Sequence, residues 1–341
     1  MAPPAFGGNV FGWSADEARS FELLDAFVDH GFNLVDTADV YEAWVPGNEG
    51  GESETIIGKW LKQSGKRDKV LIATKVGKWA RYPGLSPTNI REAVEDSLRR
   101  LQTDRIDLYQ SHQDDPKVPL EESLRAFDDL VTAGKVRVIG ASNYDATRLG
   151  DALDISASKG LARYESLQPE YNLMDRKGFE DALQPLCVKD NVGVISYYSL
   201  ASGFLSGKYR SDADLDKSKA RGAKVKNYLN DRGHRVLDAL DIVAKNHNAT
   251  PAQVSLAWVM AQPSIAAAIA SATTVEQLAD IAKSATPKLS DAELNPLRDA
   301  SAPSSLTPRA AVPHAAAGIT RLPPPAPPTP MAGPAPPPPT P

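Results

Sequence analysis

The sequence places a carboxylate, a phenol, an amine and an imidazole where a fold would bring them together. These groups belong to Asp36, Tyr41, Lys75 and His112. Asp36, Lys75 and His112 each follow a short apolar run that is typical of a buried parallel strand, and Tyr41 lies in the loop after the first run. The carboxyl ends of barrel strands meet at one rim, which holds the active site in barrel enzymes. We therefore expect these side chains to form one site.

Such a set of groups suits the protonation of an oxygen on which negative charge develops. A tyrosine titrates near ~10 in water, and we expect the ammonium of Lys75 to lower the pKa of Tyr41 while Asp36 keeps the lysine charged. His112 can position a carbonyl oxygen beside the phenol. A carbonyl that receives a hydride must have its oxygen protonated in this way. Side chains supply no hydride, so a nicotinamide cofactor is implied. Taken singly, Asp36 could equally cap a helix, whereas a lone Tyr41 is more often a packing residue and a lone His112 a loop histidine. Lys75 is harder to dismiss, because a lysine at that position would point into a barrel mouth.

Helix and strand patterns alternate along the chain. Helical spacing covers residues 15–29, 52–63, 88–101, 120–133, 145–158, 178–189, 233–247, 251–261 and 274–284. Strand-like runs cover residues 32–36, 70–75, 106–110, 136–141, 164–168, 192–197 and 265–270, with a weak candidate at 5–11. The alternation predicts an α/β fold with a parallel sheet and right-handed crossovers. We favour a (β/α)8 TIM barrel with extra helices over a doubly wound sheet, because no G-x-G occurs anywhere in the sequence.

Several helix boundaries have local signals. Ser14, Ser86-Pro87, Asn143 with Asp145, and Thr250-Pro251 stand where N-caps or first-turn prolines belong. Gly134 stands where a glycine would end a helix. These signals support the boundaries that the apolar spacing predicts.

Composition excludes some classes of partner. The chain has 341 residues, 42% hydrophobic and 24% charged, with a net charge of −5 and a pI near 5.6. This balance gives no reason to expect nucleic acid or an anionic membrane as a partner. A single cysteine, Cys187, suits a reducing compartment. The start resembles no signal peptide and no apolar run reaches membrane-spanning length, so we expect a cytoplasmic protein. We also expect no metal site.

The two ends of the chain are unusual. The first strand must be built from Pro4–Val10, and prolines and glycines make a poor central strand. Residues 303–341 are dominated by Pro and Ala, which cannot bury enough apolar surface to offset ordering entropy. The predicted division is therefore a barrel over 1–302 and a disordered tail over 303–341. A tail of this kind can serve as a ligand for SH3-type domains, although a plain linker is the commoner role.

With these residues in view, the chain resembles the aldo-keto reductases from about Phe6 to Ser301. Asp36, Tyr41, Lys75 and His112 fall on the tetrad of that family. The resemblance implies that tyrosine is the acid and that the lysine and aspartate tune it. It also implies an NAD(P)H-dependent reduction of aldehydes or ketones in a barrel.

The resemblance extends to segments that would bind the cofactor. Ser142 and Asn143, in Gly140-Ala-Ser-Asn143, and Gln168, in Leu167-Gln-Pro, would hold the nicotinamide carboxamide, and Tyr197 would stack on the ring. Leu205, Ser206 and Lys208 would lie near the pyrophosphate, and Ser271, Thr273, Thr274 and Gln277 would lie near the adenosine 2′-phosphate. Asn143 is also a plausible N-cap, Gln168 could satisfy buried backbone groups, and Tyr197 could belong to the core.

The chain also departs from the family pattern. Gly8 stands where a threonine is common near the nicotinamide, and there are no residues for the hairpin that usually closes the barrel floor. Thr273 and Thr274 stand where an arginine often grips the 2′-phosphate. NADPH remains the expected cofactor, and NADH is possible.

The predicted substrate pocket is aromatic, and three functions stay open. Trp13, Trp44, Trp79 and Phe204 lie on predicted rim loops, where they would suit a small-molecule carbonyl compound with an apolar body or would simply pack. The first function is a carbonyl reductase. The second is a regulatory protein resembling potassium-channel β-subunits, which would bind nucleotide with little turnover. The third possibility is a truncated chain that folds poorly. The native carbonyl compound and the oligomeric state are left open.

Overall fold

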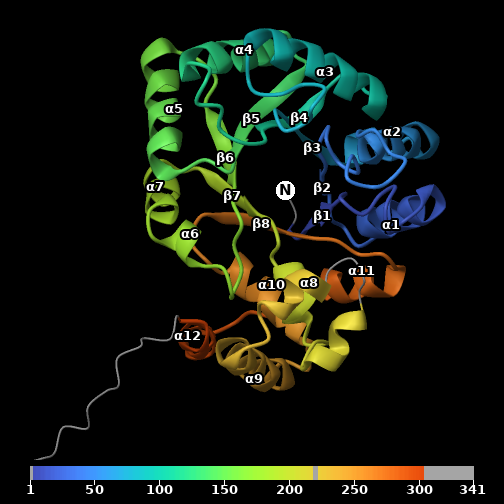
Figure 1. Ribbon diagram of the computed structural model, residues 1–341, viewed down its shortest axis with the longest axis vertical. Helices are drawn as coiled ribbons and strands as arrows, with labels where there is room; N and C mark the ends of the chain where they lie inside the picture. The colour runs from blue at the N-terminus through green and yellow to red at the C-terminus, as the bar shows by residue number, and fades with distance from the viewer. Residues whose placement is uncertain (1–2, 218–221, 303–341) are drawn as a thin grey trace, which may run out of the picture. The chain divides into compact units, whose positions relative to one another are not determined.

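The computed structural model describes residues 3–217 and 222–302, and the predicted tail at 303–341 lies outside them. In this part of the chain the strands close into a parallel barrel in sequence order (Figure 1). The strands are β1 (Ala5–Gly7), β2 (Leu34–Asp36), β3 (Leu71–Val76), β4 (Ile106–Ser111), β5 (Val136–Ser142), β6 (Tyr164–Gln168), β7 (Gly193–Ser196) and β8 (Ile265–Ala270). The predicted TIM barrel is confirmed.

Helices surround the barrel, as Figure 1 shows. They are α1 (Glu17–Asp29), α2 (Glu52–Ser64), α3 (Pro87–Leu101), α4 (Leu120–Thr132), α5 (Ala146–Lys159), α6 (Lys177–Glu180), α7 (Leu183–Lys189), α8 (Gly222–Lys226), α9 (Asp231–Asn246), α10 (Pro251–Met260), α11 (Val275–Ala282) and α12 (Asp291–Ala300). Short 3₁₀ segments are η1 (Arg67–Lys69), η2 (Ala201–Ser206), η3 (Asp212–Lys217) and η4 (Lys283–Ala285). Among the described residues, no helix has the length and apolar character that crossing a membrane requires.

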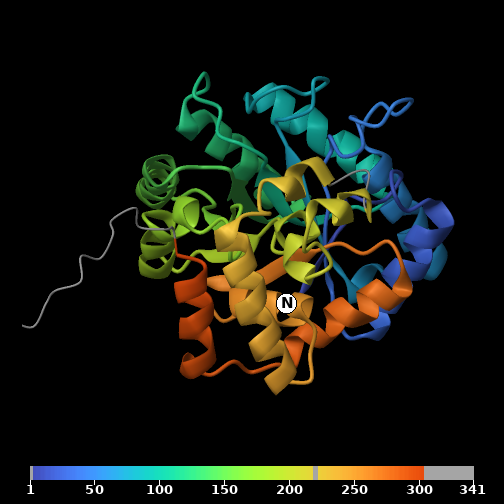
Figure 2. The same cartoon turned by 60° about the horizontal axis from the view of Figure 1, so that its bottom comes forward.

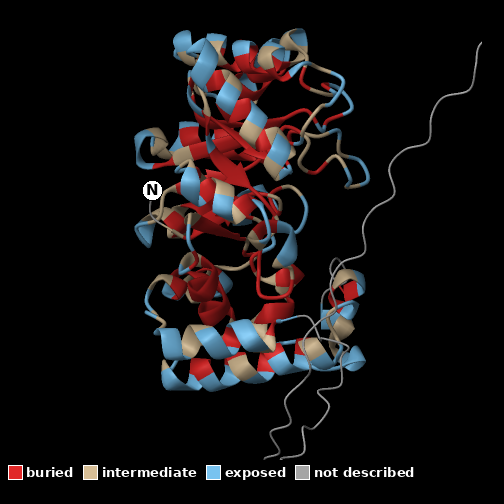
Figure 3. Cartoon of the chain, turned by 90° about the vertical axis from the view of Figure 1, so that its left-hand side faces the viewer, coloured by how far each residue is buried: buried red, intermediate tan, exposed pale blue. Residues whose placement is uncertain are grey.

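The side chains of each strand alternate between the inside of the barrel and the surrounding helices, and both sets are largely buried. In Figure 3 the strands are buried and the outer helix faces are exposed. Side chains of a strand alternate between its two faces, so Leu34 shares the inner face of β2 with Asp36, and Ala73 shares that of β3 with Lys75. Leu34 and Ala73 belong to a small apolar cluster with Leu108 of β4. Apolar residues therefore fill the barrel below the polar groups at its carboxyl end.

The first strand is shorter than the predicted range 5–11. β1 spans Ala5–Gly7 and pairs with both β2 and β8, which closes the barrel. A Cβ atom at Gly7 would lie 2.5 Å from the Ser271 hydroxyl, so a glycine is needed where β1 and β8 approach each other. Beyond β1 the chain turns, and the carbonyl oxygen of Val10 accepts bonds from the amides of residues 13–15.

Three of the expected helix starts are confirmed and one is wrong. Ser86 caps α3 and Thr250 caps α10. Ser14 does not cap α1, because Asp16 accepts the bond from the amide of Arg19 at 2.9 Å. Of the pair Asn143 and Asp145, Asp145 caps α5 and accepts the bond from the amide of Arg148 at 2.8 Å.

Other differences lie in the last third of the chain. The helix predicted over 178–189 is broken into α6 and α7, with non-helical backbone at Ala182. The short α8 was not predicted, nor was α12, which packs beside α9 (Figure 2). A capping box joins Ser290 and Glu293 at the start of α12. Pro296 lies inside this helix and weakened its sequence signal.

Candidate active site

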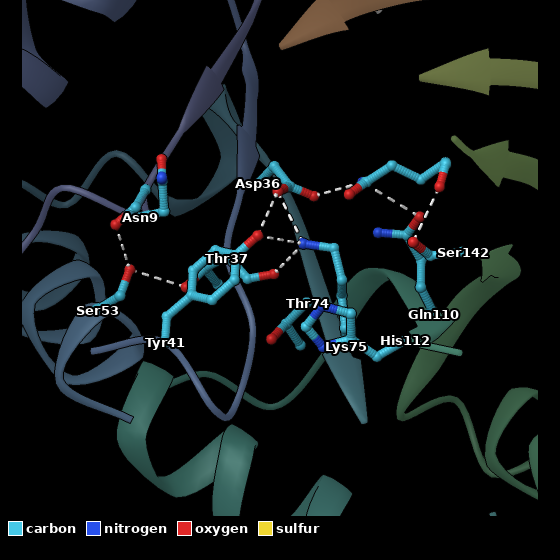
Figure 4. Close-up of polar contacts among 12 residues, drawn as sticks. Asn9, Asp36, Thr37, Tyr41, Ser53, Thr74, Lys75, Gln110, His112 and Ser142 are labelled. Carbon is cyan, nitrogen blue, oxygen red and sulfur yellow. Dashed lines mark hydrogen bonds and ion pairs between the residues drawn. The ribbon is translucent and has the colours of Figure 1, made fainter. Parts of the chain in front are cut away.

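The predicted catalytic side chains meet at the carboxyl ends of the first strands (Figure 4). Asp36 is the last residue of β2, Lys75 lies near the end of β3, and His112 directly follows β4. Tyr41 comes from the loop after β2 and reaches Lys75 (Figure 4). Asp36, Tyr41 and His112 line a cavity of about 720 Å³ that opens at this rim.

Lys75 is the centre of the polar network and is fully buried. Its Nζ donates to Oδ2 of Asp36 at 2.8 Å, to the carbonyl oxygen of Thr37 at 2.8 Å and to the hydroxyl of Tyr41 at 3.0 Å. A lysine ammonium has three protons, so every one has an acceptor. Burial lowers the pKa of Lys75, and the charge of Asp36 opposes this change by favouring the ammonium.

The structure corrects our expectation for the phenol. Burial raises the pKa of Tyr41 well above its ordinary value, and the negative charges of Asp36 and Glu42 raise it further. The Tyr41 hydroxyl lies 3.5 Å from Oδ2 of Asp36, to which it donates. Lys75 therefore does not bring the pKa of the phenol toward neutrality, because burial and the nearby carboxylates outweigh it. At neutral pH, Tyr41 holds its proton.

The imidazole of His112 is neutral at neutral pH. Burial lowers the pKa of His112 well below its usual range, and the charges of Lys75 and Lys78 add to this effect. Its Nδ1 is buried and has no hydrogen-bond partner among the described residues. The ring lies 6.1 Å from the Tyr41 ring, centroid to centroid. The His112 side chain lines the cavity beside the phenol, where it can contact a polar atom of a ligand.

A chain of amides and hydroxyls continues the network across the barrel. Nε2 of Gln168 donates to Oδ1 of Asp36 at 2.8 Å, and the Ser142 hydroxyl donates to the carbonyl oxygen of Gln168 at 2.9 Å. Nδ2 of Asn143 donates to the Ser142 hydroxyl at 3.0 Å, and the Tyr197 hydroxyl donates to Oδ1 of Asn143 at 2.8 Å. These four side chains all line the cavity.

The remaining predicted cofactor residues fall into two groups. Ser271, Thr273 and Gln277 line the cavity after β8, where Oε1 of Gln277 accepts from the amide and hydroxyl of Thr273. The residues Gly8, Leu205, Ser206, Lys208 and Thr274 do not line it.

Local structure explains these placements. Thr274 caps α11, and Leu205 is fully buried. Gly8 packs below the cavity, where its amide donates to the carbonyl oxygen of Asp36 at 2.7 Å. The backbone is left-handed at Ser202 and Gly203. These two residues line the cavity, and Leu205 and Ser206, which follow them, do not.

Of the three tryptophans predicted to line the substrate pocket, two line the cavity and one does not. Trp13 and Trp44 line the cavity, are partly exposed, and meet edge to face with centroids 6.1 Å apart. Trp79 lies outside the cavity: it is 6% exposed and its Nε1 donates to the carbonyl oxygen of Glu49 at 3.0 Å. Phe204 is fully buried in the core.

Sequence reasoning missed several residues that line the cavity. They include Asn9, Lys78, Tyr198, Ser199 and Lys224. Lys78 follows Lys75 closely in the loop after β3, and this position was the signal that could have found it. Lys224 carried no comparable signal, because it reaches the cavity from α8.

The lining of the cavity fits a nicotinamide nucleotide. The amide and hydroxyl groups at the ends of β5 and β6 can bind a carboxamide, and the ring of Tyr197 lies beside them. The segments after β7 and β8 contribute Ser202, Gly203 and Ser271, where barrels commonly bind phosphate. His112 lines the same cavity beside Tyr41.

Comparison with known proteins agrees with this geometry. The model of the Aldo/keto reductase family matches residues 5–302. An uncharacterized oxidoreductase, YrpG, of Bacillus subtilis is 36% identical over 299 residues, which cover 85% of this chain and 89% of that protein. Aldo-keto reductase yakc of Schizosaccharomyces pombe, whose name includes NADP(+), is 30% identical over 85% of this chain and 84% of its own. A probable voltage-gated potassium channel subunit beta of Arabidopsis thaliana is 30% identical over 80% of this chain and 84% of its own.

Proposed function

The chain belongs to the aldo/keto reductase family, and from this premise we propose that it reduces aldehydes or ketones to alcohols with NADPH, using Tyr41 as the proton donor. The observation that carries the proposal is the 3.0 Å contact between Nζ of Lys75 and the Tyr41 hydroxyl at the wall of the cavity. Cytoplasmic location is part of the proposal, because the single cysteine is buried and reduced.

The substrate carbonyl oxygen would lie between the Tyr41 hydroxyl and the imidazole of His112. His112 is neutral, so it can donate one hydrogen bond to this oxygen without adding a charge. Hydrogen bonds from both groups polarise the carbonyl and fix its orientation. NADPH, when bound in this cavity, would supply the hydride for the carbonyl carbon.

Tyr41 then gives its proton to the oxygen, which becomes the alcohol hydroxyl. The raised pKa of Tyr41 keeps the phenol protonated until that moment, and the developing alkoxide is basic enough to take the proton. The phenolate that remains lies 3.0 Å from the Lys75 ammonium, which stabilises it. Asp36 holds the ammonium in place and does not exchange protons in this scheme.

Cofactor binding is assigned to the lining residues. Ser142, Asn143 and Gln168 would hold the carboxamide, and Tyr197 would stack on the ring. The segments at Ser202–Gly203 and Ser271–Thr273 would bind the phosphate groups through hydroxyls and backbone amides. Leu205, Ser206 and Lys208, which were also expected near the pyrophosphate, lie outside the lining.

The preference for NADPH over NADH depends on the residues that would contact the 2′-phosphate. The yeast relative carries NADP(+) in its name, which favours NADPH. In this chain Thr273 replaces an arginine common in the family, and its amide and hydroxyl already bind Gln277. Comparing kcat/KM for NADPH and NADH measures the preference, and a clear advantage for NADH would overturn the NADPH assignment.

The decisive experiment is NADPH oxidation with a panel of aromatic and aliphatic aldehydes, using wild type and Tyr41→Phe. We expect wild type to turn over repeatedly and the variant to lose roughly 10²- to 10⁴-fold in kcat, the usual contribution of a general acid. Cofactor affinity, measured by quenching of tryptophan fluorescence, should stay within about threefold. A variant that keeps its kcat would remove Tyr41 from the mechanism.

A second candidate function is regulatory nucleotide binding. The similarity to a probable potassium channel subunit beta favours it. In that case the same assay would show tight NADPH binding with negligible repeated turnover of every aldehyde. A cooperative thermal transition of the protein should accompany either result, and its absence would point to the third possibility, an incompletely folding chain.

A further inference from the structure

Lys78 is a charged side chain on the cavity wall that the proposed reaction does not use. It lies in the loop after β3, is exposed, and has no hydrogen-bond or ion-pair partner among the described residues. The other charged groups of the lining are paired: Asp36 binds Lys75, and Nζ of Lys224 lies 3.4 Å from Glu170. Within the described lining, Lys78 thus contributes a positive charge that nothing neutralises.

No carboxylate is among the groups that act on Lys78, so none offsets its positive charge. Burial lowers the pKa of Lys78, and the positive charge of Lys75 lowers it further, without an opposing carboxylate. His112, whose pKa both lysines depress, is neutral. An anion that entered this part of the cavity would therefore meet a cation and no competing carboxylate.

The position of Lys78 separates it from the places that would hold the cofactor phosphates. It follows β3, whereas Ser202–Gly203 follow β7, and these strands lie on opposite sides of the closed barrel. Barrels bind phosphate after strands seven and eight. Lys78 shares the cavity wall with Tyr41, Trp13 and Trp44, which form the end proposed for the substrate.

We propose that Lys78 binds a carboxylate of the substrate, so that the preferred substrates are carbonyl compounds with an apolar, often aromatic, body and a carboxylate group. Trp13 and Trp44 contact the apolar body, and the Lys78 ammonium pairs with the carboxylate. The inference rests on the proposed reductase function and adds a substrate class to it. A charge-assisted contact of this kind, formed in a partly dry cavity, contributes about tenfold in kcat/KM.

The test compares substrates with and without a carboxylate, in wild type and in variants of Lys78 and of a control lysine. The substrates are 3- and 4-carboxybenzaldehyde and their methyl esters, which have the same aromatic aldehyde with and without the charge. The variants are Lys78→Gln, Lys78→Arg and Lys69→Gln. Lys69 is an exposed lysine at the amino end of β3, on the opposite face of the barrel, and serves as the control.

We expect wild type to prefer at least one acid over its ester, and Lys78→Gln to lower the ratio of the two kcat/KM values by about tenfold, mainly through KM. Lys78→Arg should retain most of the preference, and Lys69→Gln should leave the ratio unchanged. Raising ionic strength should weaken the preference in wild type and in Lys69→Gln, and should have little effect on the ratio in Lys78→Gln. Equal ratios in wild type and Lys78→Gln would overturn the inference.

A binding measurement separates this inference from the proposed function. Benzoate and benzamide are titrated against the protein saturated with NADP⁺, with tryptophan fluorescence as the signal. Tighter binding of benzoate in wild type, lost in Lys78→Gln and kept in Lys69→Gln, supports the anion site whether or not aldehydes are reduced. If the esters are reduced while neither acids nor benzoate gain from Lys78, the reductase function stands and the carboxylate site fails.

Discussion

The Lys75 ammonium lies 2.8 Å from the Asp36 carboxylate, and the two side chains are 1% and 2% exposed. Two charges removed from water stabilise a protein only as a pair, because either one alone has lost its hydration without compensation. In this chain the pair also positions a phenol, since the third proton of the ammonium is directed at Tyr41. Stability and proton transfer thus depend on the same contact.

Asp36→Asn should be strongly destabilising. It leaves the Lys75 charge buried without a partner, and we expect the free energy of unfolding to fall by about 3 kcal/mol. Lys75→Met in the same chain should restore part of this loss, because it removes the orphaned charge. Urea unfolding at pH 7 measures both effects. The exposed pair between Arg91 and Asp129 is the control, and Asp129→Asn should cost less than ~1 kcal/mol.

His112 should make the stability of the protein depend on pH below neutrality. Its pKa in the folded state lies well below the value near ~6.5 of an unfolded chain. Between these two pKa values, His112 is therefore protonated in the unfolded state and neutral in the folded state. The stability contributed by neutral His112 is full above pH ~6.5 and is lost as pH falls toward the folded pKa, by up to ~1.4 kcal/mol per pH unit. In His112→Gln this slope should be shallower, as urea unfolding from pH 7.5 to 5.5 would reveal. Equal slopes in the two proteins would refute the assignment.

Much of the site could be predicted from the sequence, because several apolar runs end at a polar residue. An apolar run that stops at Asp36, Lys75 or His112 predicts both a buried strand and a polar residue at its carboxyl end, and parallel strands bring such ends to one rim. Ser142 and Gln168 were named through the resemblance to the family, and they too are the last residues of their strands, β5 and β6. These placements depend only on strand order and alternation, which the sequence carries.

Loop residues were predicted less well, because their side chains follow local turns. Trp79 was expected on the cavity wall beside Trp44, yet its ring turns inward and binds the backbone of Glu49. The positive φ values of Ser202 and Gly203 shift the lining away from Leu205. The pKa of Tyr41 was misjudged in direction, because sequence spacing could not show how far burial and Asp36 would outweigh Lys75.

Glu42 provides a prediction from a buried carboxyl group. It is fully buried, both of its oxygens lack hydrogen-bond partners among the described residues, and burial raises its pKa to about 8. An unfolded glutamate titrates near ~4.3, so the protein loses stability as pH rises from there toward 8. Glu42→Gln removes the titration and should raise the free energy of unfolding by ~2–4 kcal/mol at pH 9 and by much less at pH 5.

A second substitution separates charge from backbone strain at this position. Glu42 has a φ of 72°, a conformation that favours glycine. Glu42→Gly should therefore stabilise through the backbone at both pH values, with an additional gain at pH 9. Thermal or urea unfolding at pH 5 and 9 distinguishes these contributions. If Glu42→Gln stabilised equally at both pH values, the raised pKa would not be the cause.

Two helical glycines should respond in opposite directions to the same substitution. A Cβ atom at Gly58 of α2 would lie 2.0 Å from the carbonyl oxygen of Arg100, so α2 and α3 could not pack as closely. Gly150 of α5 has no atom within 4 Å of its Cβ position. Gly58→Ala should lower the free energy of unfolding by ~2 kcal/mol or more through overpacking, whereas Gly150→Ala should raise it by ~0.5–1 kcal/mol through helix propensity. Both variants are measured by urea unfolding under one condition, and a stabilising Gly58→Ala would mean that the two helices separate at little cost.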